Sequence, residues 1–117
     1  MYPPEASLLS AISGKWTVLV VYTLSDKIMR HSELRRQVCG ISQKMLTQTL
    51  RSLEENGIVA RTVYPVVPPQ VEYSLTPLGK SLLEVLNVTY EWAKKHEVEV
   101  ERARQIFAAA KTDGNAV

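Results

Sequence analysis

Apolar positions near the start of the chain follow helical spacing. Leu8 and Leu9 stand four and three residues before Ile12, which predicts a short helix over residues 5–13. The next segment, residues 15–24, is apolar nearly all round, as is typical of a helix buried on several sides. We therefore expect a short helix followed by the central helix of a hydrophobic core.

A third helix is predicted after a turn. Residues 26–30 have the pattern of a turn with a brief extended piece. Ser32 then occupies an N-cap position before residues 33–38, in which Leu34 and Val38 point inward at a spacing of four. This segment is expected to be a short helix with one apolar side.

A longer amphipathic helix is predicted over residues 43–56. Ser42 is suited to cap its first turn, and Asn56–Gly57 ends it in the left-handed manner. The apolar positions are Met45, Leu46, Leu50 and Leu53, and the polar positions are Gln43, Lys44, Thr47, Gln48 and Arg51. We expect the apolar side to anchor this helix to the core while the polar side stays free.

Strand patterns follow this helix. Residues 58–64 are rich in β-branched side chains, and residues 71–75 alternate apolar with polar positions, so the two segments predict a hairpin. Pro65, Pro68 and Pro69 keep the connecting loop stiff, because proline fixes φ and cannot donate to a ladder. The loop is therefore expected to project rather than to pack.

Helical spacing returns in the last third of the chain. Thr76 and Pro77 form an N-cap followed by proline at the first helical position, where its missing N–H does no harm. We predict a long helix after them, another helix over residues 97–110 and a flexible tail over residues 111–117. The apolar surface of the long helix is wider than one small domain requires, which indicates burial against a second subunit.

Bulk properties narrow the class of protein. The 117 residues, 45% hydrophobic and 22% charged, suit one globular domain, predicted over residues 1–110. No apolar run approaches the roughly 18–20 residues of a membrane span, and the N-terminus has no secretion-signal pattern. The single cysteine, Cys39, cannot form an intramolecular disulfide. A cytoplasmic protein without a membrane partner is expected.

Charge is unevenly distributed, and no motif indicates catalysis. Residues 15–64 carry eight Lys or Arg against four Asp or Glu, whereas residues 65–117 carry six against seven, so the middle of the chain favours a polyanion. His31 and His96 are too far apart in sequence to suggest a metal pair. The sequence contains no nucleophile elbow, phosphate-cradling glycine loop or metalloprotease helix. We predict no catalytic residue, metal or cofactor, and the protein is not expected to be an enzyme.

The order helix, helix, short strand, helix, capped helix, hairpin, long helix is the layout of a winged helix-turn-helix, mainly α with a small β-hairpin. In this layout the helix over about residues 42–56 enters the major groove of DNA, and the hairpin around residues 64–71 forms the wing. The predicted base-reading residues are Gln43, Lys44, Thr47 and Gln48. Glutamine can pair with adenine, lysine can donate to guanine, and a threonine methyl can touch a thymine methyl.

A second set of polar residues is predicted to contact phosphates, which sets orientation rather than sequence preference. Its members are Arg30, His31, Ser32, Arg35, Arg36, Ser42, Arg51 and Gln70. For both sets the alternative is an ordinary solvated surface whose charges serve solubility or pair within the chain. For the base-reading residues, the order of elements and the positive middle segment favour DNA contact over that alternative. For the arginines of the phosphate set, both interpretations stay open.

Motifs along most of the chain resemble the HxlR family of bacterial winged-helix regulators. The matching segments, within roughly residues 3–93, are residues 12–17, 32–36, 40–50, 53–59, 61–65, 67–73 and 75–79. The resemblance implies extra N- and C-terminal dimerisation helices and a homodimer that places two recognition helices on a two-fold-symmetric operator. The residues implied at the dimer interface are Leu8, Leu9, Ile12, Leu82, Leu86, Tyr90, Trp92, Ala93, Ile106 and Phe107. Double-stranded DNA and a second copy of the chain are thus the expected partners.

The chain departs from the family pattern at several positions. Many members carry a Cys-Pro pair near the N-terminus, and some use that thiol to sense oxidants, but Pro3 and Pro4 stand there in this chain. Gln70 stands where the family often has a basic residue, and His31 replaces a common aromatic. Cys39 is a candidate redox residue close to two arginines, although a lone cysteine is more often an inert small hydrophobe.

Two other functions stay open at this stage. One is a winged-helix protein-interaction module that does not bind DNA, which the modest net charge of +2 and Gln70 allow. The other is an effector-responsive regulator with a small-molecule pocket at the dimer interface near Trp16 and Trp92. The simplest interpretation of these two tryptophans is that they are core or interface aromatics.

Overall fold

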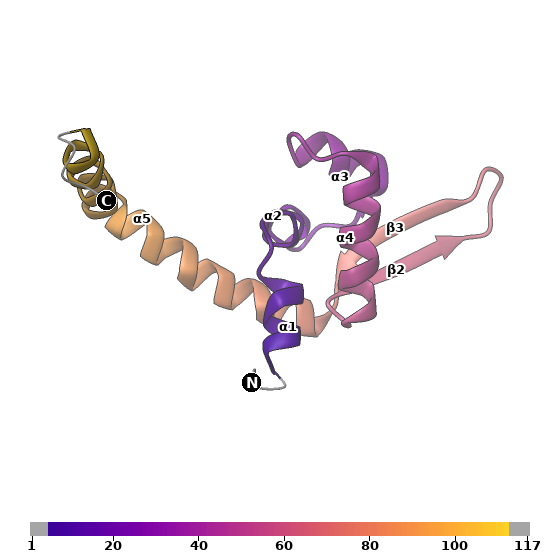
Figure 1. Ribbon diagram of the computed structural model, residues 1–117. Helices are drawn as coiled ribbons and strands as arrows, with labels where there is room; N and C mark the ends of the chain where they lie inside the picture. Colours follow the sequence, from indigo (N-terminus) through magenta and orange to yellow (C-terminus); the bar gives the residue numbers. More distant parts are fainter. Residues whose placement is uncertain (1–4, 113–117) are drawn as a thin grey trace. The chain divides into compact units, whose positions relative to one another are not determined.

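Residues 5–112 are described by a computed structural model, shown in Figure 1. The helices are α1 (Glu5–Ile12), α2 (Lys15–Leu24), α3 (His31–Gln37), α4 (Gln43–Glu55) and α5 (Pro77–Thr112), and the strands are β1 (Met29–Arg30), β2 (Val59–Tyr64) and β3 (Gln70–Leu75). This order confirms the mainly α winged helix-turn-helix fold. The chain divides into two compact units, Met1–Glu84 and Val85–Val117, and α5 begins in the first and continues in the second. The single domain over residues 1–110 stays a prediction.

The hydrophobic core of the first unit lies where α2, α3, α4 and the sheet pack together. Its largest fully buried side chains are Leu24, Leu34, Leu46, Leu50, Leu53, Val20 and Val21. Burying one such side chain contributes roughly 1.5–3 kcal/mol relative to leaving it in water. α2 is nevertheless open on one side, because Leu19 is 38% exposed. The helix is therefore less enclosed than its apolar run predicts.

α1 is short, and none of its residues is buried. The Thr17 hydroxyl on α2 donates to the carbonyl oxygen of Ala11 (3.4 Å), which ties the two helices together. α1 and α2 are bent by 67° at the break between them, and only as a pair do they have the length and composition of a membrane span. No single helix within residues 5–112 meets that test.

α3 begins two residues earlier than predicted. The expected helix starts at Glu33 with Ser32 as its cap, whereas the observed helix starts at His31 with Arg30 in the N-cap position. The reason is a hydrogen bond between side chain and backbone: the Glu33 carboxylate accepts the backbone N–H of Arg30 at 3.0 Å. The predicted inward direction of Leu34 is confirmed.

α4 begins where the sequence predicts. The Ser42 hydroxyl accepts the backbone N–H of Met45 at 3.0 Å, which confirms the N-cap. Met45 itself was predicted in the core but is 38% exposed, and the sequence prediction misses Thr49, which is only 7% exposed. The buried stripe is centred between Leu46, Thr49, Leu50 and Leu53, and Met45 falls at its edge.

The predicted hairpin is part of a larger sheet. β2 pairs antiparallel with β3, with Val59 opposite Leu75 and Tyr64 opposite Gln70. β1 also pairs with β3, so the sheet has three strands in the order β1-β3-β2. The loop between β2 and β3 projects as expected, since Val67 at its tip is 100% exposed, and Figure 1 shows this hairpin extending away from α3 and α4.

The start of α5 is held against the hairpin. The Thr76 hydroxyl accepts the backbone N–H of Gly79 at 3.0 Å, which confirms the N-cap before Pro77. The same hydroxyl donates to the carbonyl oxygen of Gly57 at 2.6 Å. Gly79 is buried so closely against Ile58 that a Cβ at this position would clash with the Ile58 carbonyl oxygen.

α5 is longer than predicted. It continues to Thr112, so the separate helix over residues 97–110 is wrong. Lys111 is helical as well, which shortens the predicted tail, and residues 113–117 lie outside the described residues. The physical reason is that no glycine or proline follows Gly79 within the helix to interrupt it.

Candidate nucleic-acid interface

The polar side of α4 is open to solvent. Its four predicted base-reading residues, Gln43, Lys44, Thr47 and Gln48, are all exposed. The opposite side of the same helix is anchored by leucines that are almost completely buried. The arrangement presents hydrogen-bonding side chains on a helix that cannot easily rotate or shift.

α3 contacts the exposed side of α4 through a histidine. The Nε2 atom of His31, the first residue of α3, lies 3.1 Å from the hydroxyl of Thr47 on α4. His31 is half-buried, and this burial lowers the pKa of its imidazole, with the charge of Arg35 lowering it further. His31, predicted as a phosphate contact, is therefore a hydrogen-bond partner of a predicted base-reading residue.

Two other residues predicted to contact phosphates, Arg30 and Gln70, are hydrogen bonded to each other. The guanidinium of Arg30 donates from Nη2 to the side-chain oxygen of Gln70 at 2.8 Å. Arg30 ends β1 and Gln70 is the first residue of β3, so this bond joins β1 to the end of the hairpin nearest its loop. Arginine has five N–H donors, and this contact uses one of them. The remaining predicted phosphate contacts are exposed: Ser32, Arg35, Arg36, Ser42 and Arg51.

A concavity lies between α4 and the β2–β3 hairpin. It is lined by Thr47, Leu50, Arg51, Glu54, Arg61 and Tyr73. Arg61 and Tyr73 are directly opposite in the strand register, and neither was predicted as a site residue. The two-residue alternation of the strands places Arg61 on the same side as the buried Val59, and this signal could have identified it.

The wing has a different surface from α4. Its tip exposes apolar side chains, among them Val66 and the fully exposed Val67. Arg61 is the only lysine or arginine between residues 59 and 75. The Glu72 carboxylate accepts a hydrogen bond from the Tyr64 side chain and, with its negative charge, raises the pKa of that phenol. The hairpin therefore offers one cation, Arg61, and an apolar tip.

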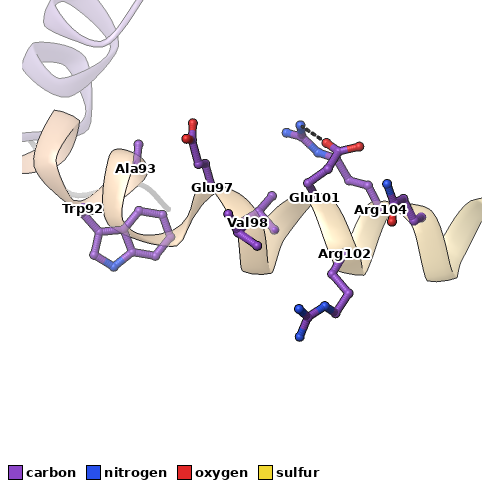
Figure 2. A pocket seen from close by; sticks show the side chains of 9 residues that line it. Trp92, Ala93, Glu97, Val98, Glu101, Arg102 and Arg104 are labelled. Carbon is purple, nitrogen blue, oxygen red and sulfur yellow. Dashed lines mark ion pairs between the residues drawn. The ribbon is translucent and has the colours of Figure 1, made fainter.

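The second unit exposes aromatic and aliphatic side chains along α5. Of the predicted dimer residues, Tyr90, Trp92, Ala93, Ile106 and Phe107 are exposed. The Trp92 ring stacks on that of His96 with 4.8 Å between centroids. Figure 2 shows residues that line an open concavity along α5, among them Trp92, Glu97 and the Glu101–Arg104 ion pair (3.8 Å).

Leu82 and Leu86, the predicted dimer residues nearer the start of α5, are half-buried, whereas Leu8 and Leu9 on α1 are exposed. Trp16 is partly buried in the first unit, where the Lys15 ammonium lies 4.7 Å from its ring centroid. The proposed effector pocket near the two tryptophans stays a prediction.

Cys39 carries a free, exposed thiol. A redox role for it stays a prediction, and Pro3 and Pro4 lie outside the described residues. Within residues 5–112, no group of three or more His, Cys, Asp or Glu side chains could hold a metal ion.

Comparison with known proteins identifies relatives over most of the chain. The HxlR-like helix-turn-helix family matches residues 11–101. The HTH-type transcriptional regulator YtfH of Escherichia coli (strain K12) is 42% identical over 106 residues, covering 91% of this chain and 84% of that protein. The HTH-type transcriptional regulator YkvN of Bacillus subtilis (strain 168) is 52% identical over 81 residues, covering 69% of each chain.

Solved structures agree with this assignment. The transcriptional regulator ytfH from Salmonella typhimurium has a TM-score of 0.78 at 40% identity, covering 87% of this chain and 91% of that chain. The redox regulator HypR in its reduced form also has a TM-score of 0.78, at 41% identity, covering 86% of this chain and 99% of that chain. The chain therefore belongs to the HxlR-like helix-turn-helix family, a family of transcriptional regulators and not of enzymes.

Proposed function

We propose that this protein is a sequence-specific DNA-binding regulator that works in the cytoplasm as a homodimer on a two-fold-symmetric operator. The observation that carries the proposal is the two-sided character of α4. Leu46, Leu50 and Leu53 are almost completely buried on one side, while the hydrogen-bonding side chains on the other are exposed. An anchored helix with a free polar side can lie in the major groove of B-DNA, which is about 12 Å wide.

The exposed residues of α4 divide into two roles. Gln43, Lys44, Thr47 and Gln48 would meet base edges, and each good bidentate base contact is worth roughly 1–3 kcal/mol of discrimination. Arg51 lies further along the helix and lines the concavity next to Arg61. These two cations would hold the phosphates that pass between the recognition helix and the wing.

Arg30 and His31 have partners within the chain, so their proposed role changes. Arg30 hydrogen bonds to Gln70 at the loop end of the hairpin, and His31 hydrogen bonds to Thr47. Both would position DNA-contacting elements in addition to any phosphate contact they make. The exposed Arg35 and Arg36 on α3 are better suited to direct phosphate contact, because their exposed side chains are free to reach the backbone.

A second copy of the chain is the proposed partner of α1 and α5. Leu8 and Leu9 on α1, and Trp92, Ile106 and Phe107 on α5, are exposed large apolar side chains. A monomeric soluble protein rarely leaves many large apolar side chains of its helices uncovered. Light scattering after gel filtration should give twice the 13.1 kDa mass of one chain. A single-chain mass at micromolar concentration would contradict the homodimer.

Salt dependence tests DNA binding directly. A dimer that makes about 6–10 phosphate contacts should lose about 10³–10⁵ in affinity for duplex DNA between 50 and 200 mM salt, because counterions are released on binding. The apolar wing specifically favours the alternative of a protein-interaction module. That alternative requires no duplex binding even at low salt, so one titration separates the two functions.

A further inference from the structure

The Thr47 hydroxyl is occupied within the protein. It lies 3.1 Å from Nε2 of His31, which belongs to a different helix and stands 16 residues earlier in the chain. The bond forms with either neutral tautomer, because Nε2 either accepts the hydroxyl proton or donates its own. Thr47 is otherwise exposed on the side of α4 that carries Gln43, Lys44 and Gln48.

Threonine offers two groups beyond Cβ, a hydroxyl and a methyl. Because the hydrogen bond to His31 engages the hydroxyl, it restricts χ1 of Thr47 and leaves the methyl as the group available to a ligand. The neighbouring Thr49 uses its hydroxyl differently, donating to the carbonyl oxygen of Met45 at 2.8 Å, and its side chain is buried. Thr47 is thus the threonine of α4 that is both exposed and held by another helix.

In the major groove, an apolar group distinguishes thymine from the other bases by contact with its C5 methyl. We propose that Thr47 is a thymine-specificity residue that uses its methyl group, and that His31 is a positioning residue that holds the Thr47 hydroxyl away from the base. This inference rests on the proposed function, since it assigns a base to one residue of the recognition helix.

The experiment uses duplexes selected from a randomised library by the full-length wild-type protein. Each thymine of the selected sequence is replaced in turn by deoxyuridine, which lacks only the C5 methyl, and the dissociation constants are measured. At one position in each half-site, the replacement should weaken wild-type binding about fourfold, the effect of exposing one methylene-sized group. Thr47→Ser keeps the hydroxyl but loses the methyl, so it should bind the thymine and deoxyuridine duplexes equally at that position. Thr47→Val keeps a methyl and should retain the discrimination.

The positioning role of His31 is tested by a separate pair of variants. His31→Phe keeps a ring but cannot hydrogen bond, so Thr47 should sample other rotamers and the fourfold discrimination should shrink. Adding Thr47→Val to His31→Phe should restore it, because valine presents a methyl without needing the hydrogen bond. A purely structural role of His31 would not be rescued in this way.

The outcomes separate the inference from the function on which it rests. If replacing thymine by deoxyuridine weakens the binding of wild type and of Thr47→Ser equally at every position, the specificity assignment is overturned while DNA binding remains intact. Full discrimination by His31→Phe would overturn the positioning role alone. If wild-type protein selects no duplex at low salt, the proposed function fails and the inference fails with it.

Discussion

The recognition helix and the wing belong to the same unit but offer opposite surfaces. α4 buries its leucines almost completely and exposes amide, hydroxyl and ammonium groups, whereas the wing exposes Val66 and Val67 at its tip and carries Arg61 as its only cation. Charged contacts weaken with salt, but apolar contacts depend little on it. If both regions meet DNA, α4 should supply the sequence-dependent part of binding, the cations of α4 and Arg61 the salt-dependent part, and the apolar wing tip a salt-independent part.

The largest expected effect concerns the anchor of α4. Leu46→Ala should lower the free energy of unfolding by roughly 2–5 kcal/mol, because the side chain is 0% exposed and its removal leaves a cavity. Val67→Ala in the wing is the matched control, and it should change stability by no more than about 0.5 kcal/mol. Urea denaturation measures both. Equal destabilisation of the two variants would mean that the wing is not a solvent-exposed loop.

Next in size is the effect of removing a base contact. Lys44→Ala should weaken binding to the preferred duplex by roughly 1–3 kcal/mol and relax sequence preference at one position. Competition between the selected duplex and point-mutated duplexes measures the preference. A decrease in affinity that is uniform over all duplexes would instead place Lys44 on a phosphate and contradict its base-reading role.

Phosphate-binding arginines should produce a smaller and sequence-independent effect. Arg51→Ala and Arg61→Ala should each weaken binding to all duplexes alike and reduce the slope of log affinity against log salt by about 0.9 for each phosphate that is no longer neutralised. The measurement is a titration at several salt concentrations. An unchanged slope for Arg61→Ala would show that the arginine of the wing does not bind a phosphate.

Val67→Ala tests the salt-independent contribution of the wing to DNA binding. The free energy of DNA binding should become less favourable by at most about 1.6 kcal/mol per wing, from roughly 0.8 kcal/mol for each of the two carbons removed, and the salt slope should match that of wild type. Fluorescence anisotropy at two salt concentrations is sufficient. A changed slope at constant charge would contradict the division of roles between the helix and the wing.

The smallest expected effect is a pH dependence of folding stability that arises from His31, where α3 contacts α4. Burial and Arg35 lower the pKa of His31 in the folded protein, so the unfolded chain binds a proton more readily. His31 should therefore destabilise the fold as pH falls below its unfolded pKa of about 6.5. Unfolding at pH 7.5 and 5.5 should show a smaller decrease in stability for His31→Phe than for wild type. Identical decreases would show that His31 is not the group responsible.

Local rules predicted some elements well and failed at others for identifiable reasons. Ser42 and Asn56–Gly57 bound α4 because capping depends on groups within one helical turn. The start of α3 was missed because the Glu33 carboxylate accepts the backbone N–H of Arg30, which makes Arg30 rather than Ser32 the N-cap residue. Met45 was misplaced because apolar character alone does not say which side of an amphipathic helix a borderline position occupies.

The amino-acid sequence by itself determined the order of elements and the polar side of α4, because these depend on periodicity and capping between residues that are neighbours in the chain. Its motifs carried the resemblance to the family. Tertiary structure alone decided the partners of the polar side chains. It joined His31 to Thr47 and Arg30 to Gln70, and brought Arg61 beside the recognition helix. Hydrogen bonds of this kind require a donor and acceptor within about 3 Å, a distance that only the packing of separate elements can set.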